Sequence, residues 1–215
     1  MGRRGIVVLF TIVTILVTIL LGCQAPPVGS AEWHFERAYK LAGDGNCDEA
    51  ILEYTKAIAV EPNMAAAYIN RGAAYASNKQ YTLTIADCTK AIELNPTLPM
   101  AYVNRAYAYN ATGEYILAID DCNKAIELVP DLTAAYVNRA YAYQGNKQYS
   151  LSIDDCNKAM ELAPEIAQPY YHRGLAYKGQ GRKNEAIADF IEFRERNLDP
   201  ELDEKAMKEI RELSK

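Results

Sequence analysis

Apolar residues recur through most of the chain at the spacing of a helix, in blocks separated by short polar turns. In one block, Tyr102, Ala106 and Tyr109 fall at positions i, i+4 and i+7, on one face of a helix. A second block of helical spacing follows the turn at residues 111–114, which contains a glycine. Pro130 closes this second block, because proline cannot continue a helix. The pattern predicts two antiparallel helices joined by a tight turn.

This helix pair is one of several near-copies. Residues 101–130 and 135–164 differ at few positions, and the closing prolines are spaced 34 residues apart. These prolines are Pro62, Pro96, Pro130 and Pro164. A fixed period of this size is typical of a solenoid, in which each unit stacks on the next. We expect five units, at residues 31–64, 65–98, 99–132, 133–166 and 167–198, of which the first and the last are the least regular.

Each unit carries the same small set of residues. The first helix has an aromatic residue, a small residue and then a tyrosine, and the second begins with an aromatic residue followed by small ones. In one unit these are Tyr102, Ala106, Tyr109, Tyr115, Ala118 and Ala125. The set resembles the tetratricopeptide repeat, and the resemblance covers residues 31–198. It implies an all-α, right-handed solenoid of five helix-turn-helix repeats that binds proteins or peptides.

A further helix is expected after the fifth unit. Asp199 suits an N-cap position, and Pro200 suits the first position of a helix. An apolar stripe follows, made of Leu202, Ala206, Ile210 and Leu213. We expect residues 199–215 to form a capping helix that covers the last apolar face of the array.

The first 22 residues have the pattern of a secretory signal peptide, with basic residues before an apolar stretch. That stretch, residues 6–21, is too short to cross a hydrocarbon core of about 30 Å as a helix. The sequence Leu-Leu-Gly-Cys at residues 20–23 resembles the lipobox of bacterial lipoproteins. The resemblance implies cleavage after residue 22 and acylation of Cys23. An uncleaved signal anchor is the alternative.

Residues 23–30 would then be a lipidated cysteine and a short tether, which contains prolines and glycine. The expected location is a membrane-anchored, extracytoplasmic one, in the periplasm or on the cell surface. Attachment to the membrane would be through the N-terminal lipid.

Charge and motif content limit the kinds of activity. The formal net charge is −5, and an acidic protein repels phosphate backbones, so we expect no nucleic acid partner. The only histidines, His34 and His172, lie far apart in the sequence. The sequence contains no nucleophile triad, zinc-binding motif or phosphate-binding glycine loop. We expect no enzymatic activity, no cofactor and no metal.

Two charged columns repeat with the units. An arginine recurs in the first helices, as Arg37, Arg71, Arg105, Arg139 and Arg173. An acidic residue recurs in the second helices, as Glu53, Asp87, Asp121, Asp155 and Asp189. A partly buried arginine needs a carboxylate partner, so we expect structural ion pairs at the seam of each unit. Capture of an anion by the arginine column is the alternative.

A cysteine column also follows the period, at Cys88, Cys122 and Cys156. Neighbouring helices lie about 8–10 Å apart, beyond the limit of about 7 Å between the Cα atoms of a disulfide. We expect these cysteines to be small buried hydrophobic residues. Cys47, which has no counterpart in the column, is expected to be buried as well.

The first helices should form the concave wall of the array. One asparagine per unit falls there, at Asn70, Asn104 and Asn138, with His172 next in register. This row resembles the asparagine ladder in the tetratricopeptide domain of O-linked N-acetylglucosamine transferases. The resemblance implies that these amides bind a peptide backbone. An asparagine side chain can donate a hydrogen bond to a backbone carbonyl and accept one from a backbone N–H. Solvated surface asparagines are the alternative.

Tyr39, Tyr107 and Tyr141 flank this row and would provide apolar anchors. Phe35 and Tyr39 occupy the columns where the carboxylate-clamp members of the family have their first lysine and asparagine. We therefore expect an extended or internal segment as ligand, rather than a chain terminus.

Taken together, these features predict a lipid-anchored extracytoplasmic adaptor that binds an extended peptide or partner protein in a concave groove. The alternative is a self-associating scaffold at the membrane, a homo-oligomer with no peptide ligand.

Overall fold

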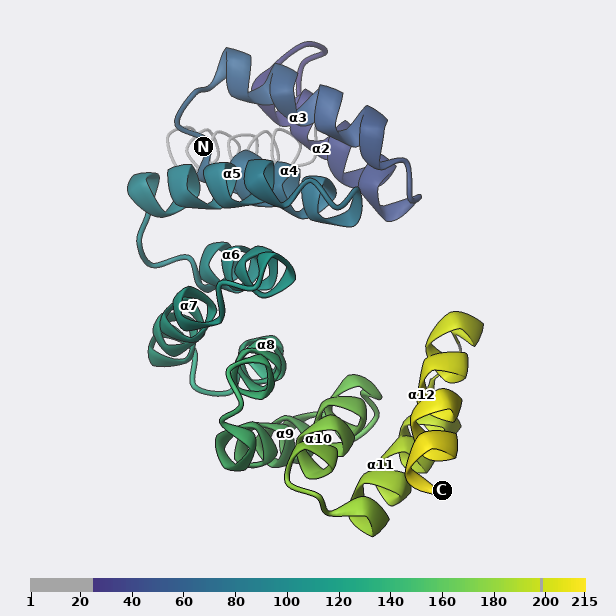
Figure 1. The fold of residues 1–215 in the computed structure, drawn as a ribbon. Helices are drawn as coiled ribbons and strands as arrows, with labels where there is room; N and C mark the ends of the chain where they lie inside the picture. Colours follow the sequence, from purple (N-terminus) through teal and green to yellow (C-terminus); the bar gives the residue numbers. More distant parts are fainter. Residues whose placement is uncertain (1–24, 198) are drawn as a thin grey trace, which may run out of the picture.

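The computed structural model describes residues 25–197 and 199–215, and every regular element in that part of the chain is a helix (Figure 1). Within these described residues, five helix pairs follow one another and a single helix ends the array. The pairs are α2 (Ala31–Gly43) with α3 (Cys47–Val60), α4 (Ala65–Ser77) with α5 (Tyr81–Leu94), α6 (Pro99–Thr112) with α7 (Tyr115–Leu128), α8 (Thr133–Gly145) with α9 (Tyr149–Leu162), and α10 (Gln168–Gly179) with α11 (Lys183–Arg196). The final helix is α12 (Pro200–Leu213). The predicted all-α solenoid is confirmed.

The pairs stack into a curved array (Figure 1). Besides packing on its own partner, each first helix contacts the next first helix, so α4 meets α6, α6 meets α8, and α8 meets α10. Helices α6, α8 and α10 lie on the inner side of the curve and α7 and α9 on the outer side (Figure 1). The free faces of the first helices therefore form the concave wall.

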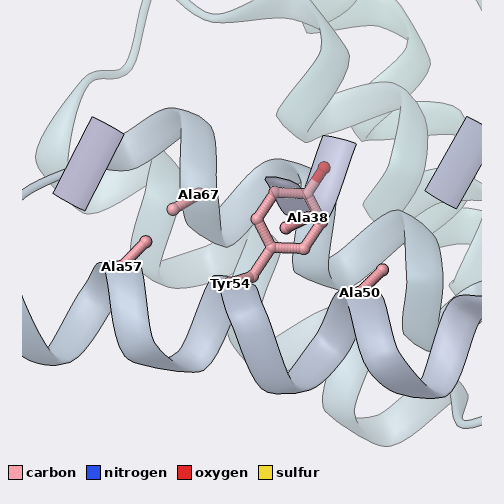
Figure 2. Close-up of a cluster of buried hydrophobic side chains, with 5 residues drawn as sticks. All are labelled: Ala38, Ala50, Tyr54, Ala57 and Ala67. Carbon is pink, nitrogen blue, oxygen red and sulfur yellow. The ribbon is translucent and has the colours of Figure 1, made fainter. Parts of the chain in front are cut away.

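The core is built from alanines that face aromatic rings. In the first pair and its junction with α4, the buried Tyr54 ring lies among Ala38, Ala50, Ala57 and Ala67 (Figure 2). Helices approach closely only where one of them presents a small side chain, and a large ring then fills the remaining space. The repeated small residues thus set the spacing of the array.

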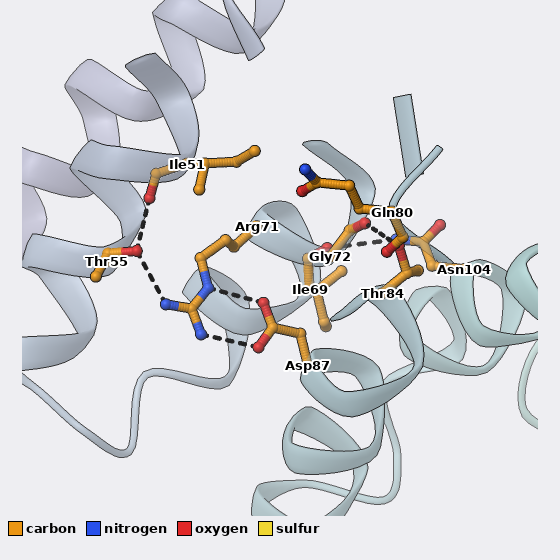
Figure 3. A network of polar contacts seen from close by, with 9 residues as sticks. All are labelled: Ile51, Thr55, Ile69, Arg71, Gly72, Gln80, Thr84, Asp87 and Asn104. Atoms are coloured by element: carbon orange, nitrogen blue, oxygen red, sulfur yellow. Dashed lines mark hydrogen bonds and ion pairs between the residues drawn. The ribbon is translucent and has the colours of Figure 1, made fainter. Parts of the chain in front are cut away.

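The predicted ion pairs are present in four consecutive units. Arg71 donates from Nε and one Nη to the two carboxylate oxygens of Asp87, both at 2.8 Å (Figure 3). Its other Nη donates to Thr55 of the preceding unit at 3.0 Å. The same bidentate geometry recurs in the pairs Arg105–Asp121, Arg139–Asp155 and Arg173–Asp189. Each guanidinium therefore joins the helices of its own unit and also reaches the unit before it.

Aromatic rings surround these arginines. The Arg71 guanidinium lies over the rings of Tyr68 and Tyr75, at 5.6 and 5.8 Å from their centroids. The hydrogen bonds to Asp87 raise the pKa of Arg71, so the charged pair is favoured. Because both ends of the guanidinium are engaged inside the array, the structure supports the ion-pair interpretation over anion capture.

The first unit departs from this pattern, and the prediction of an equivalent Arg37–Glu53 pair is correct only in a weakened form. Arg37 Nε lies 3.8 Å from Glu53 Oε1, and 55% of the arginine side chain is exposed. His34 and Lys56 bind the carboxylate more closely, at 2.6 and 2.8 Å. Within the described residues no unit precedes α2 to hold Arg37 against the seam, and its guanidinium lies over the Trp33 ring instead.

The cysteine column is buried as predicted, with Cys88, Cys122 and Cys156 fully shielded from solvent and free. Burial raises the pKa of the Cys88 thiol to about 12. The prediction for Cys47 was wrong, because this free thiol is only partly buried. Cys47 is the first residue of α3, and in the part of the chain that the structure describes no earlier unit packs against this pair.

Helix α12 caps the array. The Asp199 side chain accepts hydrogen bonds from the backbone N–H groups of Glu201 and Leu202, at 2.9 and 3.4 Å, which confirms the predicted N-cap. The predicted apolar stripe, which includes the buried Ala206, packs against the aromatic side chains of α10 and α11.

The signal sequence and the candidate lipidation site Cys23 lie outside the described residues. Within residues 25–197 and 199–215, no helix combines the length and hydropathy needed to span a bilayer.

Candidate peptide-binding groove

A cavity of about 670 Å³ opens on the concave wall where α6, α8 and α10 adjoin. Its principal side chains are Tyr81, Tyr107, Asn110, Asn138, Tyr141 and His172. The remaining lining is small, apolar or amide-bearing, and none of the described residues around it is charged. We call this cavity the central groove.

The walls of the central groove are aromatic. Tyr107 packs edge-on against Tyr81, with ring centroids 6.2 Å apart, and Tyr141 packs edge-on against His172 at 5.3 Å. Burial raises the pKa of the Tyr107 and Tyr141 phenols, so both remain protonated at neutral pH. The walls thus combine flat apolar faces with neutral hydroxyl groups.

Two side chains of the central groove carry buried polar atoms. Asn110, which is 4% exposed, donates from Nδ2 to the backbone carbonyl of Asn138 at 2.8 Å. That bond fixes the orientation of the amide, and the buried Oδ1 of Asn110 has no partner within the described part of the chain. The buried Nδ1 of His172 also has no hydrogen-bond partner among the described residues. Burial lowers the pKa of His172 to about 4, so its imidazole is neutral at pH 7.

The structure brings four of the predicted site residues together in the central groove: Tyr107, Asn138, Tyr141 and His172. Tyr39 and Asn70 line a smaller cavity of about 270 Å³ near the start of the array, together with Tyr54. Asn104 is absent from the lining of either cavity. The predicted row of residues is therefore divided between two places on the wall.

The asparagine amides also make contacts within the array. Asn138 donates from Nδ2 to the Ala134 carbonyl at 2.9 Å, and Asn104 Nδ2 lies 3.5 Å from the Ile69 carbonyl. An amide nitrogen carries two hydrogens, so each side chain retains a second donor after such a bond. Binding of a peptide backbone by these asparagines stays a prediction. It would use the second donor of each amide.

Two of the six principal groove side chains were not among the predicted site residues. Tyr81 begins α5 and belongs to the column of aromatic residues that begin the second helices, and its ring reaches the groove. Asn110 stands where the neighbouring units have Ala76 and Gln144. The only signal for Asn110 was this departure from the repeat, which a search for periodic residues passes over.

The stacked helix pairs and the groove across their first helices define a helical-repeat protein of the partner-binding class. Tetratricopeptide repeat models match residues 65–98 and 99–132, 133–166 and 167–193, and a TPR repeat model matches residues 43–79. These matches span residues 43–193, well over half of the chain. The chain therefore belongs to the tetratricopeptide repeat proteins, whose members are interaction modules.

Solved structures show the same fold. The TTC0263 protein of Thermus thermophilus aligns with a TM-score of 0.72 at 14% identity, over 84% of this chain and 98% of that one. MamA from Desulfovibrio magneticus RS-1 aligns with a TM-score of 0.68 at 22% identity, over 80% and 97%. YrrB, a TPR protein with an unusual peptide-binding site, aligns with a TM-score of 0.62 at 18% identity, over 83% and 92%.

Proposed function

We propose that this protein is an adaptor that holds an extended segment of a partner protein in the central groove. The observation that carries the proposal is the convergence of aromatic walls and fixed amides from three consecutive first helices in one open cavity. Cavities that are mostly apolar, with a few placed polar groups, are the usual binding sites of proteins. The peptide-binding site of the similarly folded YrrB supports the same use of the array.

The uncharged lining indicates which part of a partner would bind. A terminal carboxylate needs a cationic partner when it leaves water, and the central groove has no lysine or arginine among its described lining residues. Asn138 would contact the backbone of an internal segment, and Tyr107 and Tyr141 would pack against its side chains.

Capture from envelope extracts tests this function. We expect the paired substitution Asn138→Ala and Tyr141→Ala in the full-length chain to reduce recovery of a groove partner at least tenfold, because both groove contacts are lost. Leu117→Ala, a change at an exposed side chain of the outer helix α7, is the matched control and should leave recovery unchanged. Equal recovery by all three forms would contradict the proposal. Recovery of the chain alone would favour the self-associating scaffold.

We further propose that acylated Cys23 anchors the array at a membrane, outside the cytoplasm, as the lipobox resemblance implies. Cys23→Ser should abolish incorporation of a labelled fatty acid and move the protein from the membrane to the soluble fraction. Cys47→Ser is the control for loss of a thiol as such, and this variant should remain labelled and membrane-bound. A Cys23→Ser protein that stays in the membrane fraction would indicate an uncleaved signal anchor.

A further inference from the structure

Asn110 carries a buried acceptor that the fold does not use. Its amide is held by the bond to the Asn138 carbonyl, so the Oδ1 cannot turn to find another partner inside the protein. A buried polar atom without a hydrogen bond costs free energy, and such atoms are rare in folded proteins. The residue lines an open cavity, and a ligand that brings an N–H or O–H group would complete its hydrogen bonding.

His172 adds a second unpaired atom in the same cavity. Its imidazole is neutral, since burial lowers its pKa to about 4, and a neutral ring has one donor and one acceptor nitrogen. A hydroxyl group both donates and accepts, so it can pair with Nδ1 in either tautomer. The absence of charge in the described lining makes burial of an ionised side chain unfavourable here.

The surrounding rings favour a flat ligand group. Tyr107 and Tyr141 already pair edge-on with neighbouring rings, at centroid separations of 6.2 Å to Tyr81 and 5.3 Å to His172. An inserted aromatic ring can extend such an arrangement, which stabilises it beyond the burial of its area alone. The cavity, at about 670 Å³, has the usual size of a ligand pocket and more than enough room for one side chain.

We propose that the pocket formed by Asn110, His172 and the surrounding tyrosines selects a neutral aromatic side chain that carries a hydrogen-bond donor, a tyrosine or tryptophan of the bound segment. This inference deepens the proposed function and rests on it. The donor pairs with Asn110 Oδ1, and the ring packs between Tyr107 and Tyr141. The site therefore discriminates between side chains by one hydrogen bond rather than by charge.

Blocked pentapeptides of the form acetyl-Ala-Ala-X-Ala-Ala-amide test the selection, with X as tyrosine, tryptophan, phenylalanine or glutamate. Binding of dye-labelled peptides to the full-length chain in detergent is followed by fluorescence anisotropy. The tyrosine peptide should bind about tenfold more tightly than the phenylalanine peptide, which leaves Asn110 unpaired, and the glutamate peptide should bind most weakly. In Asn110→Ala, the tyrosine peptide should fall to the affinity of the phenylalanine peptide, whose own affinity stays the same.

Asn146→Ala, in the exposed turn after α8, is the control and should keep the wild-type preference. Equal affinity of the tyrosine and phenylalanine peptides for wild-type protein would overturn the inference, and this comparison needs no folded variant. A preference that persists in Asn110→Ala, or no binding by any of the peptides, would also overturn it. The capture experiment with Asn138→Ala and Tyr141→Ala tests the adaptor function separately, because it uses a whole partner and does not depend on peptide selectivity.

Discussion

Replacing Arg105 with methionine is expected to lower the free energy of unfolding by about 3 kcal/mol at pH 7, because it leaves the Asp121 carboxylate buried without its partner. The guanidinium binds both carboxylate oxygens, at 2.7 and 2.8 Å, and the aspartate side chain is only 9% exposed. Its second Nη also donates to Thr89 of the preceding unit, so a junction between units is weakened as well. Urea denaturation followed by circular dichroism measures the change.

The loss should depend on pH. Burial already raises the pKa of the Asp121 carboxyl, and removal of the guanidinium leaves burial as the main influence on that group. When a carboxyl has a higher pKa in the folded state than in the unfolded state, it lowers the free energy of unfolding as the pH rises. The loss begins near the pKa of the unfolded state and is complete above the pKa of the folded state. The loss in free energy of unfolding caused by Arg105→Met should therefore become smaller as the pH falls toward about 4, where the unfolded aspartate titrates.

Two further variants distinguish the effect of breaking the buried pair from the effect of removing any positive charge. Lys124→Met removes a cation from the exposed pair with Glu127 and should have a much smaller effect. Arg105→Met combined with Asp121→Leu removes both buried charges and should recover most of the stability. Equal losses in Arg105→Met and Lys124→Met would show that the buried pair has no special structural role.

The second large effect is expected at Gly174, where α10 meets α11. A Cβ atom at this position would lie 2.8 Å from the nearest carbon of the Phe190 ring, and that ring is fully buried. Neither helix can move away without opening the core, so Gly174→Ala should lower the free energy of unfolding by about 2 kcal/mol. Thermal and urea unfolding both measure this change.

Gly43→Ala provides the matched control for Gly174→Ala. Gly43 has an ordinary backbone conformation and open space around its Cα, so alanine should leave stability unchanged or raise it slightly. Combining Gly174→Ala with Phe190→Leu should restore part of the loss, because a smaller side chain then faces the new methyl group. A Gly174→Ala protein as stable as Gly43→Ala would contradict the close packing at this seam.

The periodic residues were sufficient to predict the fold and its internal contacts. Each column recurs in units that share one backbone geometry, so a contact inferred for Arg71 and Asp87 applies equally to Arg139 and Asp155. Among residues 25–197 and 199–215, the first unit has a neighbouring unit on one side only. In that part of the chain the contacts of Arg37 are weaker and Cys47 is partly exposed.

The candidate binding site was harder to predict, because its distinctive residue is not periodic. Asn110 interrupts its column, and its importance depends on the backbone carbonyl of Asn138 that holds its amide. The sequence also does not show which asparagine amides are engaged by backbone carbonyls. Four of the seven predicted wall residues lie in the central groove because they share the register of three adjacent first helices.

The four equivalent Arg–Asp seams make the units interchangeable. A recombination event that adds or removes one whole unit would join two compatible surfaces, because at each of these junctions the arginine donates to a threonine or asparagine of the preceding unit. The length of the array would then change in single steps without redesign of the core. The pocket draws Asn110, Asn138 and His172 from three consecutive units, so the choice of ligand side chain would persist only where those three units stay together.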